Sequence, residues 1–73
     1  MKPVFVFKTS VTTPAAVAKL KPLLDRLVQQ DERWNFDLED WENILRVESA
    51  ACSASQVIEV LKTAGYDCEA LKD

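Results

Sequence analysis

The chain has 73 residues with 48% hydrophobic content, enough for one compact core, so we expect a single domain over residues 1–73. A formal net charge of −3 and scattered lysines and arginines disfavour binding to the phosphate backbone of a nucleic acid. The apolar run Val4–Phe7 is far shorter than the roughly 18 residues of a membrane-spanning helix, so we expect no membrane insertion and a cytoplasmic location.

The N-terminal half begins with an expected strand and continues into an expected helix. Val4–Phe7 is β-branched and aromatic throughout, which is typical of a central strand. Thr13 followed by Pro14 predicts a helix start, because threonine caps helices and proline is tolerated at the first helical position. An apolar stripe at spacings of three and four extends this helix to about Gln30. Pro22 removes one backbone hydrogen bond, so we expect a kink, or a weaker first turn and a half, and not two helices. The stripe consists of Val17, Leu20, Leu24, Leu27 and Val28.

The C-terminal half predicts a hairpin, a second helix and a last strand. Residues 33–39 alternate polar and apolar side chains, and Leu45 and Val47 repeat the alternation after a polar turn at residues 40–43. Ser53 and Gln56 form a capping-box pattern, and Gly65 ends the helix that follows them. The last strand is expected at residues 66–71.

The order of these elements defines the fold class. The order β-α-β-β-α-β in one short chain predicts an α+β protein of the ferredoxin-like class, a four-stranded antiparallel sheet with two helices on one face. The opposite face of the sheet is then open to water or to a partner.

Strand alternation predicts which side chains lie on that open face. If the aromatic residues of the strands face the helices, an apolar centre with a charged rim is left on the open face. Contiguous exposed apolar patches often mark interfaces, so we expect a protein partner or self-association there. The expected interface residues are Val4, Val6, Ile44, Arg46 and Leu71. Trp41, at the hairpin tip, either folds back over the sheet edge, which we favour, or serves as a recognition anchor.

The remaining polar groups predict no catalytic site. The chain has no histidine, and Cys52 and Cys68 are far apart in the sequence, so we expect two free thiols at least half-buried. The hydroxyl-rich loop 9–13 could bind an anion at the helix start, but ordinary capping is the favoured interpretation. Four carboxylates at residues 37, 39, 40 and 42 are interpreted as a solvated turn. We therefore expect no enzymatic activity and no cofactor.

The segment Val11-Thr12-Thr13-Pro14-Ala15-Ala16-Val17 and the leucines after it resemble the heavy-metal-associated (HMA) domain of copper chaperones and metal-transporting ATPases. That family carries the pattern hydrophobic-x-Cys-x-x-Cys-Val before the same helical spacing. The resemblance continues through residues 22–25, 34–37, 43–48 and 64–66, so that it extends from Val4 to Leu71.

The resemblance implies a metal-binding loop, represented in this chain by Val11, Thr12 and Thr13 together with Tyr66. The two family ligands, however, fall on Thr13 and Ala16, and neither a hydroxyl nor a methyl group replaces a thiolate for a soft ion such as Cu(I). We therefore expect a degenerate metal site and a protein-interaction or regulatory role. The alternative is a metal-homeostasis protein that retains weak copper-type binding or docks on a metal transporter.

Overall fold

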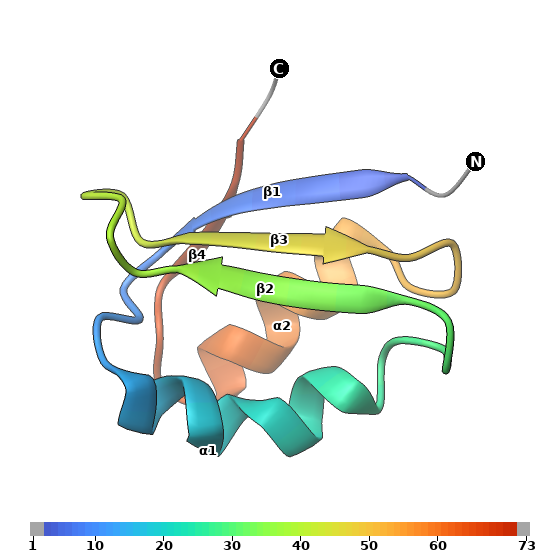
Figure 1. The fold of residues 1–73 in the computed structure, drawn as a ribbon, viewed down its shortest axis with the longest axis horizontal. Helices are drawn as coiled ribbons and strands as arrows, with labels where there is room; N and C mark the ends of the chain where they lie inside the picture. Colours follow the sequence, from blue (N-terminus) through green and yellow to red (C-terminus); the bar gives the residue numbers. More distant parts are fainter. Residues whose placement is uncertain (1–2, 72–73) are drawn as a thin grey trace.

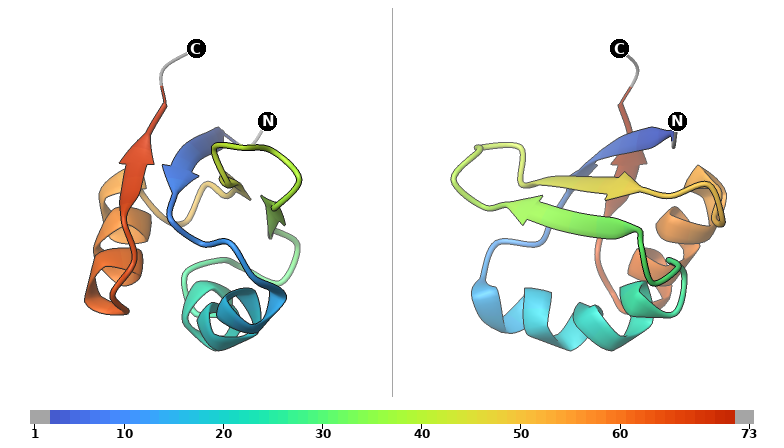
Figure 2. Two further views of the ribbon diagram at one scale, coloured as in Figure 1. Left: turned by 90° about the vertical axis from the view of Figure 1, so that its left-hand side faces the viewer. Right: turned by 45° about the vertical axis from the view of Figure 1, so that its right-hand side comes forward.

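The computed structural model describes residues 3–71 and confirms the predicted fold class (Figure 1). The elements are β1 (Val4–Thr9), α1 (Pro14–Asp25), β2 (Arg33–Asp37), β3 (Ile44–Glu48), α2 (Ala54–Thr63) and β4 (Cys68–Ala70). The strands form one antiparallel sheet in the order β2-β3-β1-β4, and both helices lie under the same face of it (Figure 2). Residues 1–2 and 72–73 of the predicted domain lie outside the described residues.

Helix α1 begins where the sequence predicts and ends five residues earlier than expected. Thr13 is the N-cap, and its Oγ1 accepts a hydrogen bond from the Ala16 N–H at 3.2 Å. Pro22 lies inside the helix, which continues past it to Asp25. Leu27 N–H donates to the Leu24 carbonyl, so the chain turns there. Leu27 still packs against the core, which is why the apolar stripe runs beyond the helix.

Helix α2 has a complete signal at each end. At its start, Ser53 Oγ accepts from the Gln56 N–H and Gln56 Oε1 accepts from the Ser53 N–H, which is the predicted capping box. At its end, Gly65 adopts a φ of 96°, Gly65 N–H donates to the Lys62 carbonyl, and Tyr66 N–H donates to the Leu61 carbonyl. These two bonds form a Schellman motif that satisfies the last carbonyls of the helix.

The core lies between the sheet and the two helices. Phe7 in the central strand β1 is fully buried, and its register neighbours are Leu45 of β3 and Ala70 of β4. The other fully buried apolar side chains come from the loop after β1, both helices and β3; they are Val11, Leu20, Leu24, Leu45, Val47, Val57 and Leu61. The predicted strand residues are therefore in place, although β2 ends at Asp37 and β4 spans only residues 68–70.

A carboxylate joins two connections at one end of the sheet. Glu32, before β2, accepts the Ser49 hydroxyl at 2.6 Å and the Ala50 N–H at 2.8 Å, both in the connection after β3. The same side chain accepts the Gln29 N–H at 2.7 Å. Ser49 is fully buried, and its Oγ accepts the N–H groups of residues 51 and 52. Glu32 thereby ties the turn that follows α1 to the loop that begins α2.

Candidate functional site

The loop between β1 and α1 holds the two positions that the HMA resemblance assigns to metal ligands. Thr13 and Ala16 are adjacent in space because the Thr13 hydroxyl caps the Ala16 N–H. Thr13 is exposed, whereas Ala16 is half-buried against the core. This pair offers one neutral hydroxyl oxygen and a methyl group, which do not fit a copper-type ion.

The rest of this loop is held by hydrogen bonds within the fold. Ser10 N–H donates to the Asp67 carbonyl at 3.2 Å, and Asp67 N–H donates to Ser10 Oγ at 2.8 Å. These bonds hold Asp67, the neighbour of Tyr66, against Ser10, the neighbour of Val11. The two segments that the HMA resemblance assigns to the metal-binding loop therefore lie side by side. Val11 is fully buried, Tyr66 is half-buried and Thr12 is exposed. The capping role favoured for these hydroxyls is thus the one that the Thr13 geometry supports.

The two cysteines lie at opposite ends of β1. Cys52 follows Ser49, whose N–H donates to the Pro3 carbonyl, whereas Cys68 is the register partner of Thr9. Both thiols are free and buried, as predicted, and burial raises the pKa of Cys68 to about 11, opposed only in part by the charge of Lys62. Within residues 3–71, no group of three or more Cys, Asp or Glu side chains is placed to hold a metal ion.

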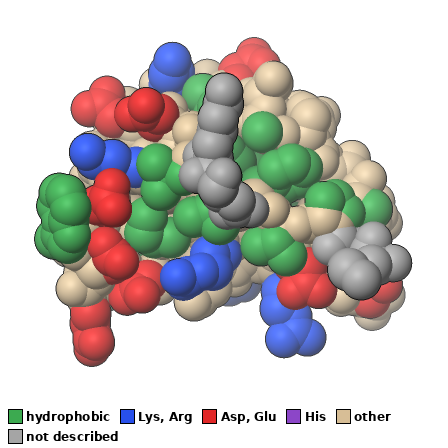
Figure 3. Space-filling model, turned by 90° about the horizontal axis from the view of Figure 1, so that it is seen from above, with side chains coloured by type: hydrophobic (Ala, Val, Ile, Leu, Met, Phe, Trp, Pro, Cys, Tyr) green, Lys and Arg blue, Asp and Glu red, His purple; other side chains and the backbone are tan. Residues whose placement is uncertain are grey.

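The open face of the sheet carries the residues predicted as an interface. The register puts Val4, Val6 and Arg46 on the same face, and the Leu71 N–H donates to the Val6 carbonyl at 2.8 Å. Val4 is 55% exposed and Val6 is half-buried, so the first part of β1 is only partly covered on this side within the described chain. Seen from above, apolar side chains gather on this face, and charged side chains lie along much of its left and lower rim (Figure 3).

Ile44 corrects one expectation about this face. It lies on the open side, opposite Lys8 and Asp37, but is only 5% exposed and does not belong to the core cluster. Strand alternation gives the direction of a side chain, whereas the cover that flanking side chains provide depends on the neighbouring strands. Ile44 therefore lies on the open side but is covered by its neighbours, so it adds little to the exposed surface of this face.

Trp41 corrects a second expectation, because it does not fold back over the sheet. Its side chain is 82% exposed, with Lys8 Nζ 5.7 Å from the ring centroid. The turn behind it is anchored to β1 by Thr9, whose N–H donates to the Glu42 carbonyl at 3.3 Å and whose hydroxyl donates to the Asn43 carbonyl at 2.7 Å. Sequence reasoning placed Thr9 in a loop and missed this buried anchor, for which a threonine at the end of an apolar strand was the only signal.

Three hollows lie on the surface of the described residues. One of about 380 Å³ is lined by side chains of both charges: Lys8, Thr9, Ser10, Lys62, Asp67, Cys68 and Glu69. A second of about 320 Å³ lies between the helices and is lined by Leu23, Leu27, Gln56, Glu59, Val60 and Thr63. A third of about 160 Å³ is lined by Val4, Arg33, Trp34, Asn35, Arg46 and Glu48. Among the described residues, no buried side-chain nitrogen or oxygen lacks a hydrogen-bond partner, so none points to a missing polar ligand.

No helix of the described chain is long and apolar enough to cross a membrane. No family model, curated protein or solved structure matches the chain, so the HMA resemblance stays a prediction.

Proposed function

We propose that this domain is a non-enzymatic protein-interaction module, and that its HMA-like loop no longer carries a metal. The observation that carries the proposal is the exposed Trp41 on an anchored turn, beside an open sheet face to which the central strand β1 contributes Val4 and Val6. Tryptophan is enriched among the residues that dominate binding energy at protein interfaces. A turn that is already ordered loses little conformational entropy when a partner binds.

The degenerate loop supports the same proposal from another direction. Thr13 and Ala16 serve helix capping and core packing, and the chain has no histidine that could act as a general base or neutral ligand. A cytoplasmic location belongs to the proposal, because both cysteines are free and disulfides are rare in reducing compartments.

The test compares capture of cellular proteins by the wild type and three variants, followed by binding measurements with the purified partner. Trp41→Ala and Val6→Glu should each weaken the same partner by about tenfold or more, since each removes a central contact. Glu59→Ala, on the exposed surface of α2, is the matched control and should bind like the wild type. A partner that binds all three variants equally would place the binding surface elsewhere and refute the proposal.

A further inference from the structure

Strand β2 is an edge strand whose outer side has no neighbour within residues 3–71 (Figure 1). Ser49 N–H donates to the Pro3 carbonyl, so these two residues form a hydrogen-bonded pair of the antiparallel ladder. The register of β1 against β3 continues from this pair, and hydrogen-bonded pairs alternate with non-hydrogen-bonded pairs along it. Backbone groups of Leu45 and Val47 therefore point towards β1, and alternation directs those of residues 44, 46 and 48 towards β2. Their partners there are residues 33, 35 and 37. The N–H and C=O groups of Trp34 and Phe36 consequently point away from the sheet.

The sequence of this edge is complementary to itself. When Arg33–Asp37 pairs antiparallel with its own copy around Asn35, Arg33 lies opposite Asp37 of the second copy, and Asp37 lies opposite its Arg33. On the helix side, Trp34 lies opposite Phe36 in the same way, and on the open side Asn35 lies opposite Asn35. Opposite charges and aromatic pairs are among the cross-strand combinations that stabilise antiparallel strands.

We propose that this chain forms a two-fold symmetric dimer in which β2 pairs with β2 of a second copy. Isolated charges on an edge strand normally prevent such pairing, but in this register each charge meets its opposite. A slip by two residues in one direction places Asp31 opposite Asp37, and a slip in the other moves the pairing onto Leu38 and Glu39, which belong to the turn. Parallel pairing in register would place identical charges side by side.

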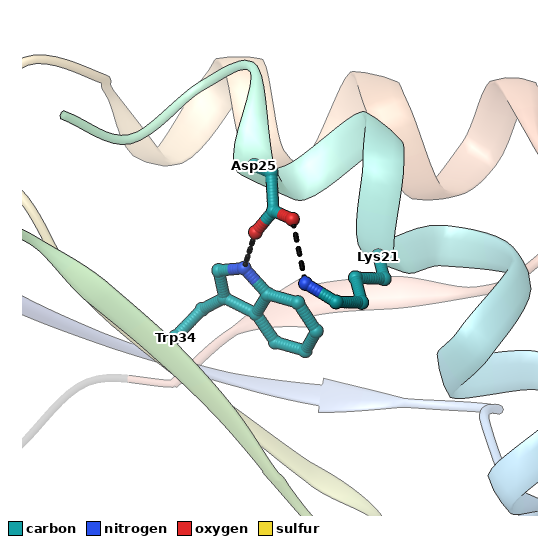
Figure 4. Close-up of polar contacts among 3 residues, drawn as sticks. All are labelled: Lys21, Asp25 and Trp34. Atoms are coloured by element: carbon teal, nitrogen blue, oxygen red, sulfur yellow. Dashed lines mark hydrogen bonds and ion pairs between the residues drawn. The ribbon is translucent and has the colours of Figure 1, made fainter. Parts of the chain in front are cut away.

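The side chains at this edge are already held in place. Trp34 Nε1 donates to Asp25 Oδ1 at 2.9 Å, and Asp25 Oδ2 accepts from Lys21 Nζ at 2.9 Å, so the indole is fixed against α1 (Figure 4). The Phe36 ring packs edge-on against Trp34 with centroids 5.9 Å apart, and both side chains are only half-buried. Arg46 lies 4.0 Å from Asp37, so the dimer would place that carboxylate between two guanidinium groups.

The dimer goes beyond the proposed function and uses a different surface. Edge pairing leaves the open face uncovered and joins two four-stranded sheets, so the two open faces become one continuous surface. The closed symmetry also limits the assembly to two copies through β2, because each chain has one such edge.

The experiment is sedimentation equilibrium from micromolar to near-millimolar concentration, with circular dichroism to verify that each variant is folded. The wild type should approach twice its 8.2 kDa mass. Arg33→Asp and Asp37→Arg should each weaken the dimer by about tenfold or more, because each places like charges opposite one another. An equimolar mixture of the two variants should restore a dimer, since every opposed pair then carries opposite charges again.

Three results would overturn the edge dimer: a wild type that is monomeric throughout, single variants that dimerise like the wild type, or a mixture that stays monomeric. Val6→Glu is the control on the open face and should leave the dimer intact. A dimer lost through Val6→Glu and retained by Arg33→Asp would place self-association on the open face instead. Partner capture is measured with Trp41 and Val6 variants, so failure of the proposed function and failure of the dimer are separate results.

Discussion

Replacing Glu32 tests whether one carboxylate joins the two connections at the end of the sheet. Glu32→Ala removes the part-buried bond from the Ser49 hydroxyl at 2.6 Å and two more exposed bonds from the N–H groups of Gln29 and Ala50. The first is charge-assisted and contributes about 1.5 kcal/mol, whereas water replaces most of the other two. We therefore expect a loss of about 2 kcal/mol in the free energy of unfolding, or roughly 10 °C in Tm for a chain of this size.

The assay is thermal and urea unfolding of Glu32→Ala, Glu32→Gln and the control Glu39→Ala, an exposed carboxylate of the hairpin turn. Glu32→Gln should fall between the wild type and Glu32→Ala, because its amide replaces one acceptor oxygen by a donor. A double-mutant cycle with Ser49→Ala should give a coupling energy of about 1 kcal/mol. A Tm change below about 2 °C for Glu32→Ala, or an additive cycle, would refute the reasoning.

Three further predictions concern other parts of the chain. Hydrogen bonds from Lys21 and then Trp34 hold the pKa of Asp25 in the folded chain below its ordinary value. The stability that these bonds add to the fold is therefore present above about pH 3.9, and it is lost as the pH falls through the lower pKa of the folded state. The Trp34 indole N–H resonance should report this titration in the wild type and not in Asp25→Asn. Gly65→Ala should lower the free energy of unfolding by about 1 kcal/mol in urea titrations. Nothing lies within 4 Å of the added carbon, so the cost comes from the φ of 96°, which strains any residue with a side chain. An unchanged urea midpoint would contradict this. In a Cu(I) competition titration, Thr13→Cys/Ala16→Cys should bind and the reduced wild type should not; tight wild-type binding would refute the degenerate-site proposal.

Much of the fold follows from local signals in the sequence. The caps at Thr13 and Ser53, the Gly65 stop and the alternation around Trp34 each predicted an element that the structure contains. The predicted end of α1 was wrong because apolar periodicity reports packing against the core, and Leu27 packs against the core from a turn, half-buried, without being helical.

The surface was harder to predict, because it depends on contacts between distant residues. The Thr9 hydroxyl reaches Asn43 across 34 positions, and Glu32 reaches Ser49 across 17. No local sequence pattern predicts such bonds. The exposure of Trp41 and the hydrogen bonds that join the turn after α1 to the loop before α2 could therefore not be predicted. The self-complementary order of residues 33–37 is visible in the sequence, but it acquires meaning only once β2 is known to be an edge strand.

The attachment of the hairpin turn to Thr9 has a consequence for binding kinetics. Because Thr9 belongs to the central strand, the turn that carries Trp41 cannot rearrange without breaking bonds to β1. A partner of the proposed interface would therefore meet a surface that needs no slow conformational step before contact, and we expect its association rate to depend on encounter and orientation. Variants of Trp41 should accordingly shorten the lifetime of the complex while leaving the association rate nearly unchanged.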